Sequence, residues 1–303
     1  MTLVCVRLEE SFNTPRITAL ADTRATVRRA DGSLKTVSDT TVKLFALPIR
    51  CYTLDSLTPV TGAWTEPYFE TTVGLGFSGH CFEALTVIAH ISQFLSALVA
   101  PNGDRPTPDA DGIVHLVVKL CEGYFSGHSG DGDPVLLLLM FGYQDGRPWI
   151  AKITRRSSEG VRSNLTWADA NTLETVGQDA LFEQRARDWR QRIQAHKASI
   201  SKKPAPKTED GVFEKEVELA RHELAERKVT EEEMLRQIES EFAEGIGGVL
   251  QRLELSLDNG KVVAGFTQDD RTYIGGASYT VSLSGHLGPI PVVEKMGRHI
   301  RKP

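Results

Sequence analysis

Short stretches in which apolar and polar residues alternate run through most of the chain, and this period of two is typical of β-strands. Three sharp turn signals, Asp31-Gly32, Asp145-Gly146 and Asp258-Asn259-Gly260, separate some of these stretches. The predicted strands are residues 2–8, 17–22, 42–47 (ended by Pro48), 71–77, 135–143, 148–154, 172–177, 249–257, 261–267 and 273–283. Residues 51–57 are expected to continue the sheet, and residues 155–170 look less regular.

Apolar residues recur at helical spacing in two blocks that interrupt the strands. The first block predicts helices over residues 81–100 and 112–125, although the Ile113-Val114 and Val117-Val118 pairs leave a strand open for the second segment. The second block predicts helices over 180–196, 212–227 and 230–243, the last with a capping-box signature at Thr230. Residues 199–211 are polar, contain two prolines and offer no core residue, so they are predicted to be an exposed linker.

This order of elements predicts an α+β fold, a four-layer αββα sandwich, because the helices come in blocks and not between single strands. A doubly wound parallel sheet would need helices that alternate with strands. We expect one domain over residues 1–284, with an exposed insertion at about 198–228. Residues 285–303 are rich in Gly, Pro and basic side chains and are expected to form a C-terminal arm.

Composition narrows the classes of function. The 303 residues are 40% hydrophobic and 25% charged, as in an ordinary globular protein, and the formal net charge of −5 gives no reason to expect nucleic acid as a partner. No apolar run approaches a membrane span, and no secretory signal stands at the N-terminus, so the expected location is the cytoplasm. The four cysteines form no CxxC pair and are expected to be reduced, and no metal or cofactor motif is found.

Candidate chemistry begins at Thr2. If the initiator Met1 is removed, Thr2 carries a hydroxyl and a free α-amine on one residue, which is a nucleophile with its own base. By itself this dipeptide is common and means little. It gains weight from three segments that follow it in order: residues 21–26 (ADTRAT), residues 41–45 (TVKLF) and residues 74–79 (GLGFSG).

With these segments the chain resembles the β-type subunits of the proteasome and their bacterial relatives of the heat-shock-locus V type, which are N-terminal-nucleophile hydrolases. Residues 21–26 are similar to that family's ADSRAT segment, and residues 41–43 to the segment that carries its lysine. Residues 75–86 (LGFSGHCFEALT) are similar without gaps to AGFAGGTADAFT, and residues 175–177 and 243–248 to two later motifs. The resemblance spans roughly residues 2–267.

The resemblance implies a role for each matching residue. Thr2 would be the nucleophile, Lys43 the cation beside it, and Asp22 the partner that keeps Lys43 charged and oriented. The amide of Gly79 would stabilise the oxyanion. Arg24 would support this network, as would Gln178 and Glu244, which stand where the family has a Ser and an Asp. The reaction would be hydrolysis of a peptide or unfolded-protein substrate, without a cofactor, in a homo-oligomeric ring with a possible ATPase partner.

Departures from the family pattern leave two alternatives open. Gln178 and Gly247 both replace family serines that help to position the Thr amine. A proteasome-like subunit without activity, acting as a scaffold or binding module, would tolerate these changes and would also retain Met1. A small-amide acylase on the same fold is the other alternative, since a fold does not fix the substrate.

Overall fold

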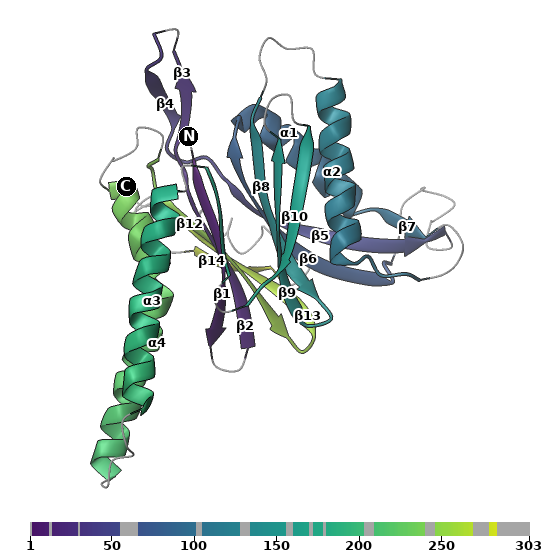
Figure 1. Cartoon of the computed structure of the whole chain (residues 1–303). Helices are drawn as coiled ribbons and strands as arrows, with labels where there is room; N and C mark the ends of the chain where they lie inside the picture. The colour runs from purple at the N-terminus through teal and green to yellow at the C-terminus, as the bar shows by residue number, and fades with distance from the viewer. Residues whose placement is uncertain are drawn as a thin grey trace, which may run out of the picture.

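The computed structural model describes residues 2–11, 14–29, 31–54, 66–100, 105–127, 134–155, 160–169, 172–177, 180–202, 209–239, 246–268 and 279–283. These residues form two six-stranded sheets, a small two-stranded sheet and four helices (Figure 1). The mixture of antiparallel sheets and blocks of helices confirms the predicted α+β class.

The first sheet holds both ends of the described chain. Its strand order is β11-β1-β2-β12-β13-β14, and every neighbouring pair is antiparallel. The strands are β1 (Leu3–Ser11), β2 (Thr14–Asp22), β11 (Leu173–Gly177), β12 (Leu250–Asp258), β13 (Lys261–Gln268) and β14 (Tyr279–Leu283). The predicted pairing of the first two strands as a hairpin is confirmed, as is the hairpin of β12 and β13.

The second sheet has the order β10-β9-β8-β6-β5-β7, with β7 parallel to β5 and the other neighbours antiparallel. Its strands are β5 (Leu44–Thr53), β6 (Phe69–Gly79), β7 (Leu98–Ala100), β8 (Leu136–Gln144), β9 (Arg147–Arg155) and β10 (Val161–Trp167). The small sheet pairs β3 (Ala25–Arg28) with β4 (Leu34–Ser38) around the predicted turn at Gly32.

Two predictions about the second sheet were wrong, and one of its strands was not predicted. Pro48 does not end its strand, because β5 continues through it to Thr53. Proline lacks a backbone N–H, but β7 pairs with β5 only from Cys51 onward, so no hydrogen-bond donor is needed at Pro48 on the side of β5 that faces β7. The helix predicted over 81–100 ends at Leu95, and its last three residues form β7. β10 was missed because an edge strand with exposed polar side chains lacks a clear apolar alternation.

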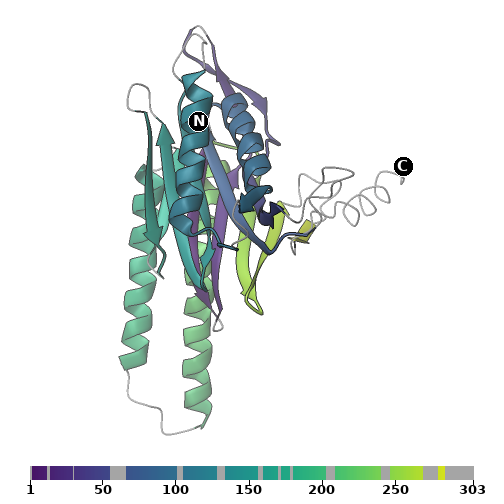
Figure 2. The same cartoon turned by 90° about the vertical axis from the view of Figure 1, so that its right-hand side faces the viewer.

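Helices α1 (Cys81–Leu95) and α2 (Ala110–Ser126) cover the outer face of the second sheet and lie in front of its strands in Figure 2. The helical prediction for the second of them is therefore confirmed. Between these helices and the sheet lies the largest apolar core, which includes Val87 and Ile91 of α1, Val117 of α2 and Trp149 of the sheet.

A second apolar core fills the space between the two sheets. Val4, Val6 and Leu253 of the first sheet meet Leu139 and Phe141 of the second. Because side chains alternate along a strand, every second residue of β1 faces this core and the residues between them face the other way.

Helices α3 (Ala180–Lys202) and α4 (Glu209–Glu239) lie along the first sheet and run past the ends of β1 and β2 (Figures 1 and 2). The separate helix predicted to start at Thr230 was wrong. No Gly or Pro interrupts the chain there, and Thr230 is fully buried within α4. The predicted linker was also wrong at its ends, since α3 continues to Lys202 and α4 begins at Glu209. Residue Ile200, within the predicted linker, is buried.

A third, smaller apolar core joins α4 to the first sheet, with Met234 and Ile238 against Leu3, Cys5 and Leu20. The single domain over 1–284 and the insertion at about 198–228 stay predictions, and the arm at 285–303 lies outside the described residues. Among the described helices, none is both long enough and apolar enough to cross a membrane.

Candidate active site

Three predicted residues meet at one end of the first sheet. Thr2 directly precedes β1, Asp22 is the last residue of β2, and Lys43 directly precedes β5 of the second sheet. Their exposed fractions are 6%, 0% and 1%. The two sheets are stacked, so the ends of three strands bring residues far apart in sequence into one buried cluster.

Lys43 is the centre of this cluster. Its Nζ donates to Thr2 Oγ1 at 2.9 Å, to Asp22 Oδ1 at 3.1 Å and to the Arg24 carbonyl at 2.6 Å. A lysine ammonium has three N–H groups, so three acceptors satisfy all of them. This geometry fits a charged Lys43 whose direction is fixed, with the Thr2 hydroxyl as one of its partners.

Asp22 is held as tightly. Its Oδ1 also accepts the backbone N–H of Leu3 at 3.0 Å, and its Oδ2 accepts the N–H groups of Arg24 at 3.2 Å and Gly247 at 3.3 Å. With Lys43, four donors surround a carboxylate that has no contact with solvent. Such bonds favour the ionised form.

Burial and pairing act against each other on the two charges. Burial raises the pKa of Asp22, while the charge of Lys43 and the surrounding donors oppose that rise. Burial likewise lowers the pKa of Lys43, and the attraction of Asp22 opposes it. Both pKa values are therefore displaced toward neutral pH.

One glycine with positive φ borders Thr2, and a second follows a residue that contacts it. Gly177 has φ of +109°, and a Cβ there would lie 1.7 Å from the Thr2 carbonyl oxygen, so only glycine fits. Gly79 has φ of +121°, and its Cβ would lie 2.1 Å from the Val135 carbonyl, at the step from β6 into α1. Ser78, just before it, donates from Oγ to the Thr2 carbonyl at 3.2 Å. The predicted oxyanion glycine thus follows a residue that contacts Thr2.

Arg24 joins the cluster mainly through its backbone, and its charge adds a smaller effect that lowers the pKa of Lys43. Its guanidinium instead bonds Asp39 Oδ1 through Nε at 2.7 Å. A Cβ at Gly247 would lie 2.3 Å from the Arg24 guanidinium carbon. The glycine that replaces a family serine therefore leaves room for Arg24. The other predicted residues, Gln178 and Glu244, lie outside the described residues, as does Met1.

Sequence reasoning missed Gln251, which is fully buried and bonds the backbone of Thr41 and Lys43. The sequence pattern around Gln251 contained a signal that could have identified it. Gln251 occupies the same face of β12 as Leu253 and Leu255, which point into the core between the sheets. A polar residue on such a face needs a partner, and that requirement marks it for attention.

A neighbouring thiol does not compete with Thr2. Burial raises the pKa of Cys81, and the charge of Lys43 opposes the rise only in part. The thiol therefore stays protonated near neutral pH and is a poor nucleophile. Cys81 is free, as are the other three cysteines.

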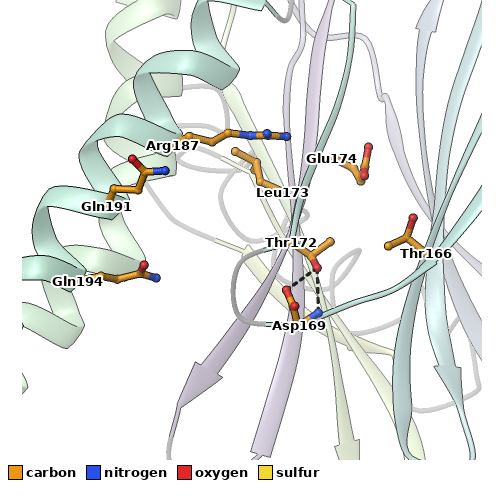
Figure 3. A pocket seen from close by; sticks show the side chains of 8 residues that line it. All are labelled: Thr166, Asp169, Thr172, Leu173, Glu174, Arg187, Gln191 and Gln194. Carbon is orange, nitrogen blue, oxygen red and sulfur yellow. Dashed lines mark hydrogen bonds between the residues drawn. The ribbon is translucent and has the colours of Figure 1, made fainter. Parts of the chain in front are cut away.

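A cavity of about 400 Å³ lies away from this cluster, between α3 and the chain that leads into β11 (Figure 3). Arg187 of α3 extends toward Leu173, while Thr172 and Asp169 bond each other. Leu173 is four residues from Gly177, or roughly 13 Å along the strand. The cavity is thus separate from Thr2. Across the described part of the chain, no group of three or more His, Cys, Asp or Glu is placed to hold a metal ion.

Comparison with known proteins gives a likeness among solved structures. No protein-family model and no curated protein matches the chain. The structure is similar to the Anbu (Gly-1) mutant from Hyphomicrobium sp. strain MC1, with a TM-score of 0.45 and 13% identity, over 100% of this chain and 98% of that chain. At that identity and TM-score, neither an activity nor a site carries over, and the chemistry must be inferred from the side chains themselves.

Proposed function

We propose that the protein is a threonine-type N-terminal-nucleophile hydrolase that cleaves peptide bonds with Thr2. The observation that carries the proposal is the 2.9 Å contact from Lys43 Nζ to Thr2 Oγ1, made by a lysine that also pairs with buried Asp22. A lysine is rarely buried unless it is paired, as Lys43 is with Asp22. Here it is aimed at a hydroxyl that becomes the side chain of residue one once everything before Thr2 is removed.

The first half of the reaction forms an ester. The Thr2 α-amine takes the Oγ proton as Oγ attacks the carbonyl carbon of the scissile amide, which forms a tetrahedral oxyanion. The C–N bond then breaks, and the departing amine takes the proton from the α-ammonium. The C-terminal product leaves, and the N-terminal part of the substrate stays on Thr2 Oγ as an ester.

The second half restores the enzyme. A water molecule gives a proton to the α-amine and attacks the ester carbonyl. The second tetrahedral intermediate then collapses, Thr2 Oγ regains a proton, and the carboxylic acid leaves. The same α-amine serves both halves, so no second base is required.

Lys43 and Asp22 make this amine usable. An α-amine has a reference pKa of about 7.7–8.0, and a nearby cation lowers it by disfavouring a second positive charge. Lys43 supplies that cation and also donates to Thr2 Oγ1, which stabilises the developing alkoxide. Asp22 keeps Lys43 charged. The Gly79 N–H is proposed as the donor to the oxyanion.

The proposal includes the architecture and assembly. The order of α1 and α2, the second sheet, the first sheet, and α3 with α4 supports a four-layer αββα sandwich. Exposed apolar side chains on α1 support contact with a second copy in a homo-oligomer: Phe82 is 76% exposed and Phe94 is 52% exposed. A ring with an ATPase partner in the cytoplasm would follow from the sequence resemblance.

Peptide hydrolysis by protein that begins at Thr2 tests this function. Thr2→Ala is expected to lower kcat by at least about 10³-fold, since it removes the nucleophile. Thr2→Ser is the matched control because it keeps a hydroxyl and an amine, and it should retain measurable turnover. Turnover by Thr2→Ala at the wild-type rate would refute the proposal.

The inactive-subunit alternative has one specific observation behind it. Gly247 offers no side chain to the Thr2 amine, and Arg24 occupies the space beside it. Intact mass separates the two functions. A chain that keeps Met1 after expression in its native host has no free Thr2 amine, so that mass would favour the inactive subunit.

A further inference from the structure

The backbone just before β5 crosses from one sheet to the other. Thr41 N–H donates to the Thr23 carbonyl at 3.0 Å, which ties this segment to the end of β2. Two residues later, the Lys43 carbonyl accepts the Phe77 N–H at 3.2 Å, which ties it to β6. The Lys43 N–H and the Thr41 carbonyl still need buried partners, because unpaired backbone groups are costly inside a protein.

The side chain of Gln251 meets both needs. Its Oε1 accepts the Lys43 N–H at 2.9 Å, and its Nε2 donates to the Thr41 carbonyl at 3.3 Å. A residue of a parallel strand makes the same two bonds, to the carbonyl of one residue and to the N–H two residues further on. The side-chain amide of Gln251 therefore pairs with this backbone in the way that one residue of a parallel strand would. Gln251 and Lys43 are both buried, so bulk water is not at hand to replace the bond to the Lys43 N–H, whereas the bond to Thr41 is partly buried.

The strand that carries Gln251 also aligns Asp22. In the register of β12 against β2, Leu250 pairs with Asp22 and Gln251 pairs with Ala21. β12 thus fixes Asp22 through strand pairing and fixes Lys43 through one side chain. The contact of 3.1 Å between Lys43 Nζ and Asp22 Oδ1 depends on both connections.

We propose that Gln251 is a positioning residue that holds the Lys43 backbone so that Nζ reaches Thr2 Oγ1 and Asp22 together. The inference deepens the proposed function and rests on it for its effect on catalysis. Gln251 does not touch the reacting atoms. It acts through Lys43, so its loss would change the rate of the chemical step more than the binding of substrate.

Gln251→Leu tests the role in turnover, because it keeps the approximate volume and removes both bonds. Its expected effect is a fall in kcat of about 10–100-fold with KM changed by less than about 3-fold. The matched control is Gln144→Leu. Gln144 Oε1 also accepts a backbone N–H, that of Ala110 at 2.8 Å, but Gln144 lies at the end of β8 away from the Leu136–Gly79 pair.

Both variants lose bonds between a glutamine side chain and the backbone, two in Gln251→Leu and one in Gln144→Leu, so both should lower the urea midpoint. Only Gln251→Leu should lower kcat. The positioning role is overturned if both variants keep the wild-type kcat per folded molecule. It is also overturned if kcat falls as much in Gln144→Leu as in Gln251→Leu, and in either case Gln251 is only a structural residue.

A conservative variant adds a signature that a merely structural role would not give. In Gln251→Glu a protonated carboxyl can accept from Lys43 N–H and donate to the Thr41 carbonyl, whereas an ionised one can only accept. The ratio of variant to wild-type kcat should therefore rise as the pH falls. A ratio that stays constant from pH 5 to pH 8 would contradict the proposal.

A readout without turnover separates this inference from the proposed function. The NMR signal of the Lys43 ε-carbon in ¹³C-lysine-labelled protein, assigned with Lys43→Arg, should differ in shift and titration between wild type and Gln251→Leu. If the wild type hydrolyses nothing but this difference appears, the function fails and the positioning role stands. If the wild type is active and the Lys43 signal is the same in both, the positioning role fails alone.

Discussion

Two buried ion pairs each include a residue of the first two strands, and their surroundings differ. The side chains of Lys43 and Asp22 are 2% and 0% exposed, and those of Arg7 and Glu9 are 4% and 6% exposed. Burial alone therefore does not distinguish them. Arg7 and Glu9 are two residues apart on β1, so their contact needs only one strand.

The Lys43 pair instead draws together residues from the starts of β1 and β5 and the end of β2, and it includes a hydroxyl. Its geometry depends on the packing of two sheets. Burying two charges is costly, and a fold keeps such a pair for stability only when the geometry is very good. Convergence of separate strands on a hydroxyl, rather than buried charge, therefore marks the candidate site.

The largest expected effect separates the two pairs directly. Lys43→Met should lower kcat by about 10²–10⁴-fold, because the Thr2 amine and hydroxyl lose their cation. Arg7→Met should leave kcat per folded molecule unchanged but cost about 3–5 kcal/mol of stability, since it leaves Glu9 buried without that partner. Turnover together with urea unfolding measures both. A fall in kcat for Arg7→Met that matches Lys43→Met would remove the distinction.

A smaller effect is expected at the glycine beside Thr2. Gly177→Ala puts a Cβ where the Thr2 carbonyl lies, so Thr2 must shift, and a displacement near 1 Å costs on the order of 10²-fold in rate. Gly146→Ala is the control. Gly146 has φ of +77° with nothing within 4 Å of its Cβ, so it carries only the backbone strain. Equal kcat in the two variants would show that Gly177 does not place Thr2.

The range of pH over which kcat is high should be limited on both sides by the pair of Asp22 and Lys43. Burial raises the pKa of Asp22, so activity that needs the carboxylate is lost as pH falls through that raised value. Burial lowers the pKa of Lys43, so activity that needs the ammonium is lost as pH rises through that lowered value. Asp22→Asn should remove the acidic limb set by this carboxyl. An acidic limb of kcat that is unchanged in this variant would assign it to another group.

The smallest expected effect concerns the other pair. Replacing both charges, in Arg7→Met with Glu9→Leu, should be neutral or stabilising by about 1–4 kcal/mol, because well-packed apolar side chains often exceed a buried ion pair in stability. The kcat should stay within about 2-fold of wild type. A double variant that is folded but inactive would mean that this pair also serves the site.

The sequence predicted the residues at the centre of the candidate site better than the residues that support them. Thr2, Asp22 and Lys43 stand at strand ends, which the alternation of apolar residues locates, and their segments carry the family resemblance. That resemblance suggested which strand ends would meet. No single-sequence pattern could place a glutamine of β12 against the backbone before β5, because that contact depends on how the two sheets stack.

The sequence also predicted two of the helices better than the other two. α1 and α2 have apolar faces that fill a large core, and their spacing predicted them. α4 contacts the first sheet through a small apolar core with charged residues beside it, including Glu233 with Arg236 and Glu231 with Arg252, and α3 packs on α4. Their sequence is polar around most of the helix, so the pattern fixed neither the end of α3 nor the continuity of α4.

Thr2 is tested as the nucleophile most directly by the site at which a β-lactone reacts with protein that begins at Thr2. Peptide mapping by mass spectrometry should find one adduct, an ester on Thr2 Oγ, and should find none in Thr2→Ala. Its rate of formation should fall in Lys43→Met. A protein with a free Thr2 amine that forms no adduct, or forms it only on Cys81, would contradict Thr2 as the nucleophile.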